Sequence, residues 1–149
     1  MGYPVLHTLA LRQGATFPQV LRWGVPPVIY KAITMATQTA PCVLTVTAHD
    51  VPAGWPIAVS GIKGMTQLNA RSTPPAAEEY FKATVRNSNT IELNDVDASS
   101  FSVYQSGGYI RYNTPVDMAG YTARMQLRRK VASPDILLSL TTENGGITL

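Results

Sequence analysis

The chain is divided along its length into short runs of β-branched and aromatic residues, and this pattern constrains its fold more than any other feature. Gly, Pro, Asn or Asp bounds each run, so the runs are the length of strands rather than of helices. Many short strands at close spacing are typical of a β-sandwich or a β-barrel. The predicted strands are 5–11, 17–23, 28–34, 43–48, 56–60, 80–86, 90–93, 101–104, 109–112 and 121–128.

Local signals support an all-β fold. Apolar and polar residues alternate along 121–128, which predicts a strand with one buried and one wet face. Residues 87–89 and 106–108 have the composition of hairpin turns, and 117–120 are expected to turn with Asp117 capping its own turn. Helix signals are confined to 74–80, where two prolines precede two glutamates, and this segment allows a turn or two at most.

The composition of the chain argues against several classes of function. Charged residues make up only 14% of the chain and the net charge is +3, with Arg128, Arg129 and Lys130 as the one adjacent basic group. This charge is too weak for a surface that neutralises a run of phosphates, so nucleic acid is not an expected partner. The longest apolar runs fall far short of ~18 residues, so no membrane insertion is expected. The N-terminus does not resemble a signal peptide, which places synthesis in a reducing cytoplasm.

The chain offers little for catalysis, and we expect no catalytic residues, no cofactor and no metal site. One cysteine and two histidines are too few for a disulfide framework or a structural zinc. Cys42 and His49 lie seven residues apart, about 23 Å along an extended strand, which is beyond hydrogen-bond reach. Cys42 is therefore interpreted as a small buried apolar residue, and His49 with Asp50 as a turn. Enzymatic activity is not predicted.

The order of the strands indicates two small lobes, one inserted into the other. Residues 33–108 form a self-contained pattern of strands and turns, whereas 1–32 and 109–149 look like two parts of one host β domain. Insertions succeed at exposed loop tips where entry and exit lie close together. The predicted fold class is therefore all-β, with two small β-sandwich or barrel lobes.

The inserted stretch resembles a known module. It carries the ordered blocks VLTVTAHD (43–50), IAVSGIKGM (57–65), NTIEL (89–93) and YQSGG (104–108). These blocks resemble the small β-barrel repeat of bacteriophage virion proteins that is named after the first catalytic cysteine half-domain (FCCH) of ubiquitin-activating enzymes. The resemblance implies a scaffold and carries no ubiquitin chemistry.

The flanks resemble a second phage module. The blocks are QGATF (13–17), VDMAGYTARMQLR (116–128) and LSLTTENGGITL (138–149). They are similar to the N-terminal domain of baseplate upper proteins, which anchor receptor-binding organelles. That family keeps the first two blocks close together and carries further strands after the Gly-Gly turn. The resemblance therefore implies an interrupted host domain with an open sheet edge, or a polypeptide that continues beyond Leu149.

Together these features predict a virion structural protein of the tail, baseplate or head–tail region, made in the bacterial cytoplasm. It would contact other virion proteins and copies of itself through unpaired strand edges, with Ile147 and Leu149, or the strand beside them, at a subunit contact. The alternatives are a capsid decoration protein and a module that binds a host receptor or glycan. The candidate anchors of that binding module are Trp55, Tyr104, Tyr109 and Tyr112.

The two tryptophans have separate predictions. Trp23 precedes a Gly- and Pro-rich segment and is expected to close one end of the host core. Trp55 lies in a loop of the insert beside Pro56, where it either packs against the lobe or stacks on a partner.

Overall fold

The computed structural model describes residues 20–130 and 133–149, and within them the fold is nearly all β. This confirms the predicted fold class. The predicted strand at 5–11 and the first part of 17–23 lie outside the described residues, and 20–23 are not in a strand. The elements are β1 (Gly24–Ala32), β2 (Met35–Ala36), β3 (Cys42–Thr45), β4 (Pro56–Lys63), η1 (Thr66–Leu68), η2 (Ala77–Glu79), β5 (Phe81–Asn87), β6 (Thr90–Leu93), β7 (Ser106–Pro115), β8 (Arg124–Arg128) and β9 (Ile136–Thr141).

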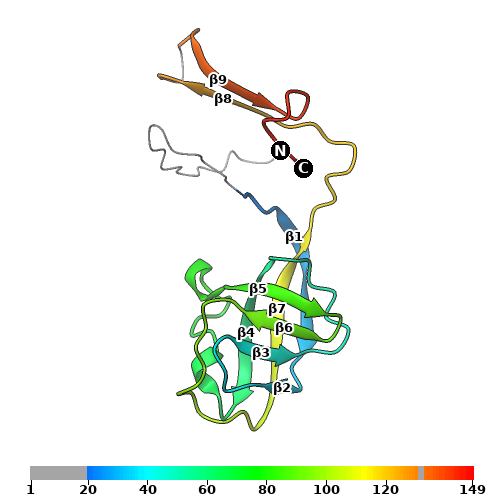
Figure 1. Ribbon diagram of the computed structural model, residues 1–149, viewed down its shortest axis with the longest axis vertical. Helices are drawn as coiled ribbons and strands as arrows, with labels where there is room; N and C mark the ends of the chain where they lie inside the picture. The colour runs from blue at the N-terminus through cyan, green and yellow to red at the C-terminus, as the bar shows by residue number, and fades with distance from the viewer. Residues whose placement is uncertain (1–19, 131–132) are drawn as a thin grey trace.

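Seven strands form one antiparallel sheet in the order β1-β7-β4-β5-β6-β3-β2 (Figure 1). The first and last strands of this order are neighbours in sequence, joined by a bend at Ile33 and Thr34. The Ile33 amide donates to the Gly108 carbonyl at 2.9 Å, and the next amide, of Thr34, donates to the Thr45 carbonyl at 2.9 Å. The bend therefore links the two ends of the sheet, and β1–β7 curl into a small barrel.

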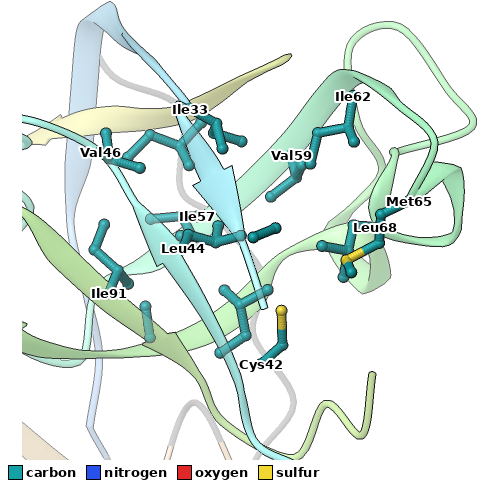
Figure 2. Close-up of a cluster of buried hydrophobic side chains, with 14 of the residues drawn as sticks. Ile33, Cys42, Leu44, Val46, Ile57, Val59, Ile62, Met65, Leu68 and Ile91 are labelled. Carbon is teal, nitrogen blue, oxygen red and sulfur yellow. The ribbon is translucent and has the colours of Figure 1, made fainter. Parts of the chain in front are cut away.

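The barrel core follows from the alternation of side chains along its strands. In β3, Cys42 and Leu44 are fully buried, and they lie opposite Leu93 and Ile91 of β6, which are also fully buried. The intervening residues of both strands are half-buried, as expected where successive side chains point to opposite faces. Figure 2 shows the aliphatic side chains of β3, β4 and β6 converging with Met65 and Leu68, which come from the turn around η1.

The glycine pair at 107–108 does not make the predicted hairpin turn. It lies near the start of β7, beside β4, and both glycines have positive φ, +71° and +89°. A Cβ atom at Gly108 would stand 2.5 Å from Cγ1 of Ile62. The glycines therefore allow β4 and β7 to approach closely, and the chain does not reverse there.

The predicted lobe boundaries at 32/33 and 108/109 are also wrong. β7 pairs with β1 on one side and with β4 on the other, so residues assigned to the host flanks belong to the sheet of the insert. The barrel extends from β1 to β7, and its entry and exit lie side by side, where the Val116 amide donates to the Trp23 carbonyl at 2.9 Å. Trp23 itself is 69% exposed, so it does not close a core. The association of 1–23 with 116–149 stays a prediction, because 1–19 lie outside the described residues.

Beyond the barrel, β8 and β9 form a separate two-stranded antiparallel sheet that stands apart from the barrel (Figure 1). The connection contains the predicted turn: the Asp117 carboxylate accepts the Ala119 amide at 2.9 Å, and Gly120 has φ +78°. One predicted strand is absent from the described residues, because 101–104 form a loop.

Candidate interaction surfaces

Three of the four aromatic side chains predicted as binding anchors are used by the barrel itself. The Trp55 indole donates from Nε1 to the Asn113 carbonyl at 3.0 Å and packs against the core. The Tyr104 hydroxyl lies 3.0 Å from the carbonyl of Ile33. Tyr112 is only 1% exposed and its hydroxyl donates to the His49 carbonyl at 2.7 Å, so its prediction as a contact residue is wrong. Trp55 and Tyr104 are half-buried, and a contact role for them stays a prediction.

Tyr109 is the exposed one of these aromatics, and it belongs to a cluster on the outer face of β1 and β7. Its ring lies 5.3 Å from that of Tyr30 at an interplanar angle of 67°, an edge-to-face contact. The Arg111 guanidinium carbon stands 5.8 Å from the centre of the Tyr30 ring, within range of a cation–π contact. Both rings are substantially exposed, 54% for Tyr30 and 40% for Tyr109. We call Tyr30, Tyr109 and Arg111 the tyrosine patch.

Cys42 and His49 have structural partners, in agreement with the interpretation of their sequence positions. Cys42 is fully buried, its Sγ donates to the Thr37 carbonyl at 3.3 Å, and burial raises the pKa of the thiol. The buried His49 ring accepts the Val51 amide at Nδ1, 3.0 Å away, which leaves Nε2 to donate to the Asn87 carbonyl at 2.7 Å. The ring therefore joins its own turn to the hairpin between β5 and β6.

Glu79 has the most strongly perturbed carboxylate of the described residues, and its partners explain why. It accepts the hydroxyl of Ser72 and the backbone amides of Arg71, at 2.5 Å, and Ala76, at 2.8 Å. These donors, the Ser72 hydroxyl foremost, lower the pKa of Glu79 to about 2. The carboxylate thus holds the loop before η2 in place.

The β8–β9 sheet carries an apolar face. The register places Met125 opposite Leu140 and Leu127 opposite Leu138, so these four side chains point to the same side. We call them the hairpin face. Met125 and Leu127 are each 38% exposed and Leu138 is 46% exposed, while Leu140 is partly buried. The other side of the sheet carries the directly opposed polar pairs Arg124 with Thr141 and Gln126 with Ser139, and also the 53% exposed Leu137.

The segment after β9 folds back on the end of the hairpin. Asn144 accepts the amides of Thr141 and Gly146 at 2.9 and 3.0 Å, and it donates to the Ser139 carbonyl at 3.1 Å. The Ile147 amide donates to the Thr141 carbonyl at 3.1 Å, and Leu149 is 52% exposed. A subunit contact at Ile147 and Leu149 stays a prediction. The strand beside them is β9, and β8 and β9 pair only with each other among the described residues, so each leaves one edge open.

The strand predicted over 121–128 is present only as β8 (Arg124–Arg128), and its apolar side, which was expected to be buried, is partly exposed. Met125 and Leu127 alternate with polar neighbours, which correctly predicts that they share one apolar face of the strand. Whether another element covers such a face depends on distant parts of the fold. Tyr30 was missed, although its place between Ile29 and Lys31 in a predicted strand put it on one face of that strand.

No model of a known protein family matches the chain, and no curated protein matches it in sequence. Among the described residues, no group of His, Cys, Asp and Glu is arranged to hold a metal ion. The helices within 20–130 and 133–149 lack the length and apolarity that crossing a membrane requires.

Proposed function

We propose that this protein is a non-enzymatic structural subunit of a bacteriophage virion, in the tail, the baseplate or the head–tail region, where it joins other virion proteins. The observation that carries the proposal is the partly exposed hairpin face on a sheet that has two strands among the described residues. An isolated two-stranded hairpin is marginally stable in water, and exposed apolar surface is a common mark of a protein contact. The hairpin is therefore expected to be completed by assembly.

In this proposal the barrel is the folded scaffold that carries the hairpin. Its core is closed at the bend between β1 and β2, and the chain enters and leaves it at one point, between Trp23 and Val116. A hairpin carried beyond that point can bind a partner without opening the barrel. This arrangement fits an adaptor, whose work is to hold neighbours in register by shape and by strand edges.

The titratable groups support a structural role over a catalytic one. Cys42 and His49 are buried with backbone partners, and the Glu79 carboxylate is held by the loop that it organises. Catalysis needs such groups to converge on a reacting atom. These three instead satisfy donors and acceptors of the fold.

The assignment to a virion rests on the resemblance of the barrel blocks and the flanking blocks to phage modules. The test is mass spectrometry of gradient-purified particles of the phage that encodes the chain, together with an amber mutant of its gene. We expect the protein in particles at a fixed copy number, and incomplete tails or unjoined heads and tails without it. A protein abundant in the lysate but missing from purified particles would refute the proposal.

A second candidate function is binding of a host receptor or glycan, and the tyrosine patch favours it. Exposed Tyr rings beside an Arg present stacking surface and donors at low entropic cost. The test is adsorption of particles that carry Tyr30→Ala and Tyr109→Ala. Normal assembly with slowed adsorption supports this function, and unchanged adsorption removes it.

A further inference from the structure

We infer that the tyrosine patch binds an acidic sugar, whose acid group lies on the Arg111 guanidinium and whose ring lies against Tyr30 and Tyr109. The inference rests on the second candidate function and names the class of its ligand. Tyr30 lies opposite Arg111 in the register of β1 and β7, and Tyr109 is two residues from Arg111 in β7. All three side chains therefore project from the same outer face of the barrel wall.

The patch presents hydrogen-bond donors that the described chain leaves unused. Within residues 20–130 and 133–149, the side chains of Tyr30, Tyr109 and Arg111 form no hydrogen bond and no ion pair. Of the guanidinium nitrogens of Arg111, only Nε is enclosed without a partner, so the group is open at its two Nη atoms. A ligand can therefore approach Arg111 end-on and accept two parallel N–H donors.

The charge of this barrel wall favours an anionic ligand. The adjacent strands β1, β7 and β4 carry three basic residues, Lys31, Arg111 and Lys63, and no Asp or Glu. Lys31 is already paired with Asp50 at 2.9 Å, whereas Arg111 has no acidic partner among the described residues. A carboxylate and a phosphodiester each carry one negative charge and two acceptor oxygens, which match the two Nη donors of Arg111.

The size of the patch favours a sugar over a folded protein. The Tyr30 and Tyr109 side chains are 54% and 40% exposed, which corresponds to roughly 200 Å² of accessible surface for the two rings together. A stable protein interface buries about 800 Å² on each partner. The residues opposite Tyr109 in the neighbouring strands are the small Ala32 and Ser60, so the aromatic surface ends there. Its area suits one or two sugar rings, whose C–H faces stack on aromatic rings.

The strand that carries Tyr109 and Arg111 has no free edge for a peptide. β7 is paired with β1 on one side and with β4 on the other. An extended peptide that adds a strand to a sheet needs an open edge, so this mode of recognition is closed to the patch. The patch therefore recognises its ligand through side chains alone, and phenol rings beside a planar guanidinium suit a rigid ligand because they lose little freedom on binding.

The first test is a titration of the isotope-labelled full chain, followed by the NMR shifts of its amides. The two acidic probes are an oligomer of galacturonic acid, which carries carboxylates, and a mannose oligomer linked by phosphodiesters. The controls are the methyl ester of the galacturonic acid oligomer, which keeps the rings and loses the charge, and polyglutamate. We expect at least one acidic probe to bind at β1 and β7, and the comparison shows which acid the patch takes. Binding of neither acidic probe, equal binding of the methyl ester, or tighter binding of polyglutamate overturns the inference.

The second test locates the binding with variants. Arg111→Gln should weaken binding of the acidic probe at least about tenfold, and Arg111→Lys should lose most of the binding too, because it keeps the charge without the fork of donors. Tyr30→Ala should also weaken binding, and it leaves the guanidinium in place. Arg129→Gln is the matched control, since it removes the same charge from an exposed arginine beyond β8, and it should change affinity less than about twofold. Full binding by Arg111→Lys, or equal losses for Arg111→Gln and Arg129→Gln, overturns the inference.

The adsorption of particles separates this inference from the function on which it rests. Slowed adsorption of the tyrosine variants, together with no binding of either acidic probe, overturns the inference and leaves the receptor-binding function standing. Binding of an acidic probe at the patch, together with unchanged adsorption, removes the receptor-binding function and supports the acidic-sugar site.

Discussion

The contact between the end of β4 and the loop before β7 predicts a sharp difference between two glycines. Gly64 has φ +87°, and a Cβ atom there would stand 2.1 Å from the Val103 carbonyl oxygen. Gly61 also has a positive φ, +76°, but the nearest atom to its Cβ would be a Tyr109 ring carbon at an ordinary 3.6 Å. Alanine therefore meets the strain of a positive φ at both positions, and a backbone clash only at Gly64.

The magnitudes can be worked from these distances. The left-handed backbone costs an alanine roughly 1–2 kcal/mol, and this cost is common to both variants. Relief of the clash at Gly64 requires movement of the segment whose Gln105 amide donates to the Lys63 carbonyl at 2.9 Å. Overpacking of this kind adds about 1–3 kcal/mol. We expect Gly64→Ala to lose about 2–5 kcal/mol of unfolding free energy and Gly61→Ala about 1–2 kcal/mol.

The assay is urea unfolding of the full chain, followed by circular dichroism and by tryptophan fluorescence at one protein concentration. The difference between the variants is the decisive quantity, because the effect of replacing glycine in the unfolded chain is common to both and cancels. Equal losses at the two positions would show that the close approach of Gly64 to Val103 does not constrain the barrel.

Three further predictions follow from buried or hydrogen-bonded groups. Tyr112→Phe removes the hydroxyl that donates to the His49 carbonyl and should cost about 0.5–1.5 kcal/mol in urea unfolding. Cys42→Ala leaves a small cavity in the core and should cost about 1 kcal/mol, with no effect on assembly. The pKa of Glu79 is about 2 in the folded protein against an ordinary 4.5, so its carboxylate stabilises the fold above about pH 4.5 and loses that effect as the pH falls toward 2. Glu79→Gln should therefore lower the melting temperature at pH 6 and converge with the wild type as the pH falls through about 2.

Local sequence patterns predicted the elements whose partners are close in sequence. The turn at 87–89 and the strand Thr90–Leu93 are where the composition placed them, because β5 and β6 are joined by that turn. The lobe boundaries failed for the opposite reason. β7 pairs with β1 and β4, which are far away in the chain, and the sequence of residues 106–115 does not indicate which strands it pairs with. The glycines at 107–108 favoured a predicted turn and lobe boundary there, because glycine is common both where a chain reverses and where two strands approach closely.

The candidate contact residues show what alternation can and cannot establish. Tyr109 and Tyr112 are three residues apart in one strand, so they lie on opposite faces and cannot both anchor one surface. That conclusion was available from the sequence, and it agrees with the exposed Tyr109 and the buried Tyr112. The same parity puts Met125 and Leu127 together on one face of β8. Alternation defines which side chains share a face, but whether that face is covered depends on which elements pack on it. For the hairpin face, the described chain supplies no complete cover, so its role depends on which surface covers it in the assembled protein.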